Sequence, residues 1–557
     1  MSQLYYGDNL EVLREHVADE SVDLIYLDPP FNSNANYNIL FKSPKGAVAD
    51  SQIEAFEDTW HYGPEAAQAF HEVMTSGNTD VANLLRSMQE FLGQNDMMAY
   101  LAMMAARLIH LHRVLKPTGS LYLHCDPTAS HYLKLLLDGV FGADQFRSEI
   151  IWKRTSAHNS AKRWGPIHDV ILFYTKSNAY IWNRTFTAYD ASYVQRYYRH
   201  EDAAGQRYRL SDLTASGTRN GESGQPWNGF DPTAHGRHWA IPGIIKEMFP
   251  DAPPETKTLG WLDLLAKHGL VAMTGEGTGW PHFKRYLDKM EGQSPQDIID
   301  DIPPLSQRHA ERLGYPTQKP LMLLERIIAA SSNEGDVVLD PFCGCGTAVH
   351  AAQKLNRRWI GIDLTYLAIG LIERRLREAF PGIAFETVGE PKGLMDAQHL
   401  AASEPYQFQY WITQKIGGQP YQGGRKGADR GIDGYIYYTR NEVAHGKSST
   451  SAAIVSVKAG RNIGVAMVRD LKGVIDREKA NIGIFVCVAN PSREMEREAA
   501  AAGIWTDPVT GMPYPRLQLF TLAELFQGRQ PQVPLLDRQT GYRRARAEDS
   551  GKQGMLL

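Results

Sequence analysis

The chain contains two short apolar runs that each end on a carboxylate followed by proline and then an aromatic residue. Residues 22–27 lead into Asp28-Pro29-Pro30-Phe31, and residues 337–339 lead into Asp340-Pro341-Phe342. Runs of β-forming residues that stop at proline are typical of buried strands at their carboxyl ends. Ligands of open α/β sheets bind at these ends. The pattern predicts an α/β fold with a site at one sheet edge, although the first run alone also fits a strand that ends in a loop.

The second run continues into a glycine-rich turn. Gly344 and Gly346 precede an expected helix over 349–355, and glycines here permit a tight turn and close approach of backbone to a ligand. The next expected strand, 358–363, ends on Asp363, which is suitably placed for a ribose diol. Position 349 is valine, whereas a dinucleotide site needs a small residue there. This argues against nicotinamide and flavin cofactors and favours a nucleoside without a pyrophosphate.

Together these residues resemble the S-adenosylmethionine-dependent, amino-methylating DNA methyltransferases. That family has a D/N/S-P-P-aromatic catalytic loop and an F-x-G-x-G cofactor loop, matched here by 28–31 and 342–346. The catalytic loop comes first, an order that resembles the circularly permuted beta class. Segments 6–9, 115–124 and 314–320 also resemble family motifs. The resemblance covers about residues 4–390 and implies a Rossmann-like methyltransferase sheet.

The resemblance also implies roles for individual residues. Asp28 and the Pro29 carbonyl would accept hydrogen bonds from the amino group of a flipped-out base, on which Phe31 would stack. The implied catalytic residues are Asp28, Pro29, Pro30 and Phe31. The implied cofactor-binding residues are Asp8, Asn9, Thr317, Lys319, Pro320, Asp340, Pro341, Phe342, Gly344, Gly346, Thr347 and Asp363.

Aspartate at position 28 favours adenine N6 as the methylated atom, because cytosine-N4 enzymes of the family more often carry serine there. Cytosine-N4 methylation is therefore the first alternative. A second alternative, from a different class, is a DNA-binding specificity module with an inactive methyl site. Cofactor binding without methyl transfer would identify that module.

Positive charge is concentrated in one part of the chain. The whole chain has a net charge of −4, but residues 151–220 hold 11 Lys/Arg against 5 Asp/Glu, together with twelve aromatic residues. Cations with interleaved rings are typical of DNA contact, and a solvated basic face over an ordinary core is the alternative. The candidate DNA-binding residues are Lys153, Arg154, Lys162 and Arg163. Double-stranded DNA is the expected partner, and a homodimer or a restriction partner stays open.

The pattern along the 557 residues predicts several domains. We expect a catalytic half and a cofactor half separated by an inserted target-recognition region rich in Gly, Pro and Trp. A linker at 390–393 precedes a separate α/β unit and a polar tail. The expected bounds are 1–180 (catalytic half), 181–312 (insertion), 313–390 (cofactor half), 403–530 (α/β unit) and 531–557 (tail).

The α/β unit resembles the Mrr-like branch of the PD-(D/E)-x-K restriction endonucleases. Asp433 and Lys458 match the family's metal-binding aspartate and its lysine, which implies a Mg²⁺ site with Asp433 as a ligand. Ser456 stands where the family has an acid or glutamine. Because serine is a poor ligand for a hard cation, the sequence leaves DNA cleavage undecided.

Composition excludes other classes of protein. Four cysteines are too few and too scattered for a disulfide framework or a zinc site, and no Pro-Cys pair supplies the thiolate of a cytosine-C5 methyltransferase. The sequence contains no leader-like start and no apolar run of membrane-spanning length. We therefore expect a soluble, cytoplasmic protein without a membrane partner.

Overall fold

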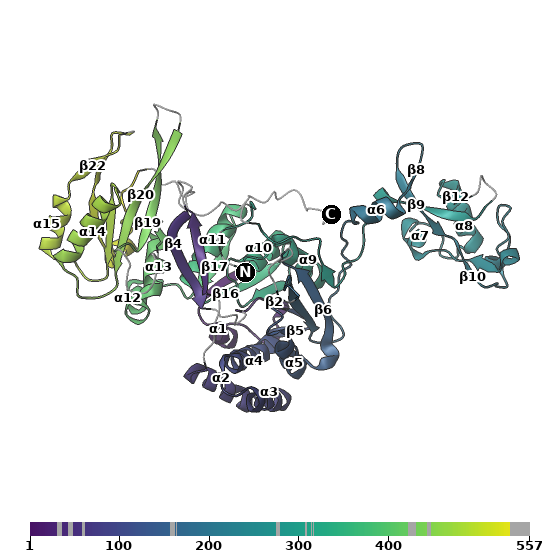
Figure 1. Cartoon of the computed structure of the whole chain (residues 1–557), viewed down its shortest axis with the longest axis horizontal. Coiled ribbons are helices and arrows are strands. Elements are labelled where there is room, and N and C mark those ends of the chain that lie inside the picture. The colour runs from purple at the N-terminus through teal and green to yellow at the C-terminus, as the bar shows by residue number, and fades with distance from the viewer. Residues whose placement is uncertain are drawn as a thin grey trace. The chain divides into compact units, whose positions relative to one another are not determined.

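The computed structural model describes residues 1–30, 36–42, 48–57, 62–155, 162, 164–274, 279–306, 309–313, 315, 317–421, 431–442, 447–508 and 510–534 (Figure 1). Within these residues the chain forms two compact units. Residues 1–183 and 296–534 make the first unit, and residues 184–295 make the second.

A nine-stranded mixed sheet is the centre of the first unit (Figure 1). In spatial order its strands are β14 (Ile298–Ile299), β6 (Phe146–Lys153), β7 (His168–Thr175), β5 (Leu115–Cys125), β2 (Val22–Leu27), β15 (Val337–Asp340), β16 (Arg358–Asp363), β1 (Ser2–Tyr6) and β17 (Phe385–Val388). The strands from β5 to β17 are parallel to their neighbours, whereas β7 is antiparallel to β5 and β6. This is a Rossmann-like mixed sheet, as the sequence predicts.

Hydrophobic cores cover both faces of the sheet, which explains why every residue of β2 is buried and apolar residues do not alternate with exposed polar ones. Ile25 and Leu27 point into one core, and Leu24 and Tyr26 into the other. The first core is closed by α1 (Asn9–Glu15), α2 (Pro64–Thr75), α3 (Thr79–Leu92), α4 (Asp96–Val114) and α5 (Ser130–Phe141). The second is closed by α9 (Leu321–Ser331), α10 (Thr347–Lys354) and α11 (Tyr366–Ala379).

Helix α10 begins two residues before the expected helix over 349–355. Gly346 is its N-cap and has φ of +75°, a left-handed conformation that suits glycine. Two further elements of this unit lie outside the sheet: a hairpin of β3 (Asn36–Lys42) with β4 (Val48–Glu57), and the short helix η1 (Ala143–Gln145).

The second unit has its own hydrophobic core, formed around Trp227, Trp239, Trp261 and Phe283. Its sheets are β12 (Val271–Met273), β13 (Pro281–Tyr286), β9 (Arg207–Asp212) and β8 (His200–Glu201), and β10 (Thr214–Ser216) with β11 (Arg237–Trp239). Its helices are α6 (Ala191–Tyr197), η2 (Glu222–Gly224), η3 (Thr233–His235), α7 (Gly243–Met248), α8 (Thr258–Lys267) and η4 (Leu287–Lys289).

The C-terminal part of the first unit contains a five-stranded sheet with a core on each face. Its strands, in spatial order, are β18 (Gln419–Pro420), β19 (Gly434–Glu442), β20 (Lys447–Lys458), β21 (Gly483–Cys487) and β24 (Leu517–Thr521). A hairpin of β22 (Ile504–Thr506) with β23 (Pro513–Pro515) comes between β21 and β24 in the sequence. The helices are α12 (Leu394–Ser403), α13 (Pro405–Lys415), α14 (Val465–Arg477), α15 (Arg493–Ala501) and α16 (Leu522–Phe526).

Helix α12 lies before residue 403, where the sequence places the start of the C-terminal unit. Its residues Ala397, Leu400 and Ala401 are nevertheless buried in the same core as Phe408 and Trp411 of α13. We therefore count α12 with the C-terminal fold. Separately, no helix among the described residues is long and apolar enough to cross a membrane.

Gly361 lies where β16 packs closely against the glycine-rich turn at 343–346 and helix α10. A Cβ atom at this position of β16 would lie 2.9 Å from Cys343 Sγ and 3.1 Å from a methyl group of Val349. We expect Gly361→Val to lower the free energy of unfolding by about 1–3 kcal/mol, measured by urea unfolding. Gly473→Ala is the control, because a Cβ there meets open space in helix α14. A neutral Gly361→Val would contradict the close packing.

Candidate functional site

Three carboxylates lie at one edge of the nine-stranded sheet. Asp28 follows β2, Asp340 ends β15 and Asp363 ends β16, and these strands are parallel neighbours. Burial raises the pKa of Asp340 well above its ordinary value, and the charges of Asp28 and Asp363 also act to raise it. The three acids are therefore close enough to interact, although Asp28 and Asp363 stand more than 300 residues apart in sequence.

Asp28 is paired on one oxygen and unpaired on the other. The ammonium group of Lys319 binds Asp28 Oδ2, and Lys319 is only 7% exposed. Asp28 Oδ1 is buried and has no hydrogen-bond partner among the described residues. Buried acceptors in native proteins normally have partners, so an unsatisfied one at a strand end indicates a place for a ligand donor. Of the adjacent residues, Pro29 is buried and Pro30 half-buried, whereas Phe31 lies outside the described residues.

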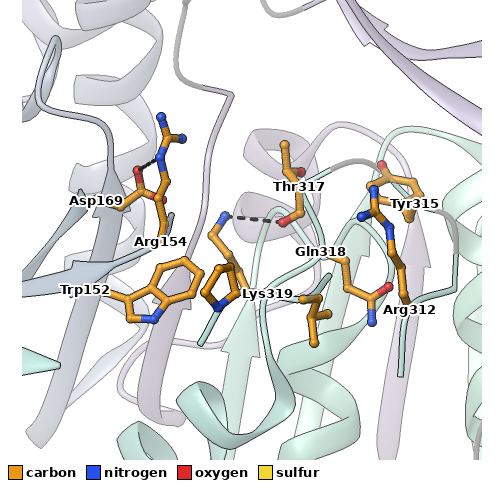
Figure 2. Close-up of a pocket in the computed structure, with 10 residues that line it drawn as sticks. Trp152, Arg154, Asp169, Arg312, Tyr315, Thr317, Gln318 and Lys319 are labelled. Atoms are coloured by element: carbon orange, nitrogen blue, oxygen red, sulfur yellow. Dashed lines mark hydrogen bonds and ion pairs between the residues drawn. The ribbon is translucent and has the colours of Figure 1, made fainter. Parts of the chain in front are cut away.

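Lys319, the partner of Asp28, is one of the residues that line a pocket of about 240 Å³ (Figure 2). Its lining residues are Trp152, Arg154, Asp169, Pro304, Leu305, Arg312, Tyr315, Thr317, Gln318 and Lys319. The Trp152 indole donates a hydrogen bond to the carbonyl of Ile302 over 2.9 Å, which fixes the plane of the ring. Thr317 has φ of +58°, which is uncommon for a residue with a side chain and indicates backbone strain at the pocket.

Buried polar groups connect β2 to the wall of the pocket. The Tyr26 hydroxyl lies 2.9 Å from His124 Nδ1, and His124 Nε2 lies 3.1 Å from Asp169 Oδ2. Arg154 completes the row, with its Nε 3.2 Å from Asp169 Oδ1. Burial acts to raise the pKa of Asp169, but the hydrogen bond from His124 and nearby cations outweigh it and lower the pKa. Asp169 is thus held as a carboxylate in the pocket wall.

Three of the four candidate DNA-binding residues lie within the described part of the chain. Arg154 turns to Asp169, as Figure 2 shows, so its charge is already partly neutralised. Lys153, at the end of β6, and Lys162 are both exposed. Arg163 lies outside the described residues.

The glycine turn holds Asp363 by backbone donors. The N–H of Gly344 donates to Asp363 Oδ2, and Thr365 donates both its N–H and its hydroxyl to Oδ1, each over 2.9 Å. Gly344 and Gly346 have φ of +52° and +75°, and a Cβ at Gly346 would lie 2.9 Å from Ile372 Cγ1. Burial raises the pKa of Asp363 to about 6, against the effect of these hydrogen bonds.

Arg107 of α4 binds two residues, Asp8 and Asn9, that the sequence assigns to the cofactor site. Its guanidinium group is 3% exposed and donates to Asp8 Oδ2 over 2.9 Å and to Asn9 Oδ1 over 2.6 Å. Asn9 in turn donates to the carbonyl of Pro341 over 2.8 Å. The available signal in the sequence was an arginine in the middle of the long apolar helix 96–114.

Arg375 of α11 likewise binds residues of the glycine turn and of the helix that follows it. It is 3% exposed and donates to the Cys345 carbonyl over 3.0 Å, the Thr347 hydroxyl over 3.1 Å and His350 Nδ1 over 3.1 Å. The remaining predicted residues lie nearby: Pro320 is the N-cap of α9, and the Phe342 N–H donates to Asp340 Oδ1 over 3.0 Å.

In the C-terminal fold, Asp433 lies beside strand β20, which contains Ser456 and Lys458. The Val457 N–H donates to Asp433 Oδ2 over 2.6 Å, and Lys458 Nζ lies 3.9 Å from the same oxygen. Gln409 of α13, which the sequence did not single out, donates its amide to Asp433 Oδ1. The described part of the chain contains no cluster of three His, Cys, Asp or Glu side chains able to hold a metal ion.

Comparison with known proteins agrees with both folds. Residues 22–372 match the DNA methylase family, and the chain belongs to that family. Residues 406–527 match a second family, the NACHT-associated inactive restriction endonuclease 1.

Three curated relatives illustrate the first match. The type II methyltransferase M.EcaI of Enterobacter cloacae is 34% identical over 50% of this chain and 57% of its own length. The Mod subunit of the type III restriction-modification enzyme StyLTI of Salmonella typhimurium is 28% identical over 63% of this chain and 49% of its own. The DNA adenine methyltransferase YhdJ of Escherichia coli is 24% identical over 67% and 82%. The chain thus spans about half the length of the first two relatives.

The raised pKa of Asp363 predicts a pH-dependent effect on stability. The pKa of Asp363 is 3.8 in the unfolded chain and about 6 in the folded one, so the folded state binds the proton more tightly. The protonated side chain therefore favours folding, and this contribution to the free energy of unfolding is lost as the pH rises from 4 to 7. Relative to Asp363→Asn, the wild type should lose about 2 kcal/mol of unfolding free energy over that range, measured by urea unfolding. The exposed Asp251→Asn is the control. Parallel pH profiles for wild type and Asp363→Asn would contradict the assignment.

Proposed function

We propose that the protein transfers a methyl group from S-adenosylmethionine to adenine N6 in duplex DNA. The observation that carries the proposal is the buried, unpaired Asp28 Oδ1 at the same sheet edge as Asp340 and Asp363. An unpaired buried acceptor, bound to a lysine that lines a small pocket, provides a place for the amino group of a base. Membership of the DNA methylase family supports the same reaction.

The residues of the turn fit S-adenosylmethionine. Gly344 and Gly346 have positive φ, and a Cβ there would press on Tyr315 and Ile372, so glycine keeps the turn tight with its backbone open to a ligand. Asp363 offers carboxylate oxygens of the kind that bind a ribose diol. Asp8, Asn9, Thr317, Lys319, Pro320, Asp340, Pro341, Phe342 and Thr347 complete the proposed cofactor site. When bound, the cofactor supplies the electrophilic methyl group of a sulfonium.

The chain's own residues activate and orient the amine. The lone pair of the adenine amino group is delocalised into the ring, so it is a weak nucleophile. Asp28 Oδ1 and the Pro29 carbonyl accept its two hydrogen bonds and localise the lone pair on nitrogen. Lys319 binds Oδ2 and fixes the rotation of the Asp28 carboxylate. Fixed acceptors stabilise the positive charge that develops on nitrogen during transfer.

We assign the pocket beside Asp28 to the flipped-out base. A base inside a duplex cannot reach Asp28, so it must leave the stack. The Trp152 ring offers a flat face, and Asp169 and Arg154 offer an acceptor and a donor for the base edge. Phe31, Pro30, Lys153, Lys162 and Arg163 retain the catalytic-loop and DNA-binding roles that the sequence predicts.

Adenine is the preferred base because position 28 is aspartate, and the name of the relative YhdJ agrees. Cytosine N4 remains the alternative. The finer assignments are part of the same proposal: the permuted beta class, the bounds 1–180, 181–312, 313–390, 403–530 and 531–557, and target reading by the insertion. A cytoplasmic restriction-modification system is the proposed setting, with a restriction subunit or a second copy as partner.

The C-terminal fold is proposed to be an Mrr-like domain that no longer cuts DNA. Gln409 and the Val457 N–H donate hydrogen bonds to Asp433, and Lys458 forms an ion pair with it, whereas a Mg²⁺ site needs several oxygen ligands around the ion. Ser456, 3% exposed, adds no charge.

Replacing Asp28 separates catalysis from cofactor binding. We expect Asp28→Ala to lower the rate of N6-methyladenine formation by about 100-fold or more, because an acceptor of the transferring amine is lost. The affinity for S-adenosylhomocysteine should stay within about twofold in calorimetry, since Asp28 does not contact that ligand in our assignment. Nucleoside analysis of the DNA measures the product, and Asp19→Ala on the surface is the control. Full activity of Asp28→Ala, or N4-methylcytosine as the sole product, would overturn the assignment.

We expect the chain to show no DNA cleavage when Mg²⁺ is added. We expect plasmid DNA incubated with the protein and Mg²⁺ to remain supercoiled, and the melting temperature to be unchanged by the ion. The double variant Gln409→Glu with Ser456→Glu adds two carboxylates beside Asp433 and should gain a Mg²⁺-dependent rise in melting temperature. Mg²⁺-dependent nicking by the wild type that disappears in Lys458→Ala would refute the inactive site.

A further inference from the structure

Two tyrosines at the cofactor edge of the methylase sheet also belong to the C-terminal core. Tyr6 is the last residue of β1, and Tyr366 is the first residue of α11. Their rings stack with centroids 3.7 Å apart and an angle of 14° between the planes. Tyr366 is 1% exposed and lies in the same hydrophobic cluster as Leu400, Phe408 and Trp411 of the C-terminal helices, against which Tyr6 also packs. The two folds therefore share a core at this stack.

Polar side chains of the C-terminal helices bind the same pair. The hydroxyl of Tyr6 donates to Glu404 Oε2 over 3.1 Å, at the residue that precedes α13. The N–H of Tyr366 donates to Gln407 Oε1 over 3.2 Å. The first N–H groups of a helix lack partners within that helix, so Gln407 satisfies a donor that α11 cannot satisfy itself.

The two tyrosines flank Asp363 on both sides. Tyr6 is opposite Asp363 in the parallel register of β1 and β16, and the N–H of Gly7 donates to the Asp363 carbonyl over 3.1 Å. Thr365, the neighbour of Tyr366, donates twice to the Asp363 carboxylate. A shift of the stack would therefore reach Asp363 through one covalent neighbour on each side: its backbone carbonyl through Gly7 and its carboxylate through Thr365.

We propose that Glu404 and Gln407 are positioning residues for methyl transfer: by holding Tyr6 and Tyr366, the C-terminal domain fixes the orientation of Asp363 toward the cofactor. This role rests on the proposed cofactor site. It explains what a restriction-endonuclease-like fold contributes to this chain when its described residues contain no cluster able to hold a metal ion. The coupling is reciprocal, so cofactor binding must also stabilise the contact of α12 and α13 with the stack.

Single-atom and side-chain changes in the full-length chain test the coupling. Tyr6→Phe keeps the ring and removes the hydroxyl that binds Glu404, and Gln407→Ala removes the acceptor of the Tyr366 N–H. We expect each to raise the Kd of S-adenosylhomocysteine about threefold to tenfold in calorimetry, the effect of one lost hydrogen bond. The KM for S-adenosylmethionine should rise equally, with kcat and the KM for DNA unchanged. Tyr5→Phe is the matched control, because that hydroxyl donates only to Gln3 in the adjacent part of β1.

Hydrogen exchange gives a second readout that a purely structural contact would not change. Adding S-adenosylhomocysteine should slow amide exchange across 394–415 in the wild type and in Tyr5→Phe, and much less in Gln407→Ala. Unchanged Kd values in both variants, even with lowered melting temperatures, would overturn the positioning role. Failure of the wild type itself to bind S-adenosylhomocysteine would instead overturn the proposed cofactor site, and the positioning role with it.

Discussion

The parallel register of β2, β15 and β16 is the constraint on which the site depends. Val338 and Leu339 of β15 pair with Leu24 and Ile25 of β2, and Leu339 also pairs with Ile360 of β16. Because parallel strands end at the same edge, this register brings two loops that are distant in sequence to one place. A shift by one residue would exchange the two faces of β2, which are both buried, so the two cores fix the register.

Grouping carboxylates at a buried edge is unfavourable, and the surrounding residues show how the fold offsets it. Lys319 binds Asp28, and Arg107 binds Asp8 and Asn9. Asp363 has only backbone N–H groups and Thr365, and its pKa is raised by burial to about 6. Asp340 and Asp363, whose pKa values burial raises, are both assigned to the cofactor site. This is the arrangement expected where a site is built for binding rather than for stability.

The sequence predicted the elements that follow local rules. The apolar runs at 22–27, 337–339 and 358–363 are strands, and the glycine turn precedes a helix, because period, proline and glycine act locally. It did not predict Arg107, Arg375 or Gln409, since their partners are distant in sequence and buried arginines look like any surface cation. It also missed α12 as part of the C-terminal fold and the shared core at Tyr366, because a contact between two folds leaves no periodic pattern in either. The roles of the individual site residues stay predictions.

The central claim is that the strand-end edge holds the cofactor with its reacting end toward Asp28. The most direct measurement is a crystal structure of the full-length protein with S-adenosylhomocysteine. Our account predicts the ribose hydroxyls on Asp363, the adenosine against the turn at Gly344 and Gly346, and the sulfur on the side of Asp28. Binding of the ligand in the pocket of Trp152 and Arg312, or away from Asp363 altogether, would contradict it.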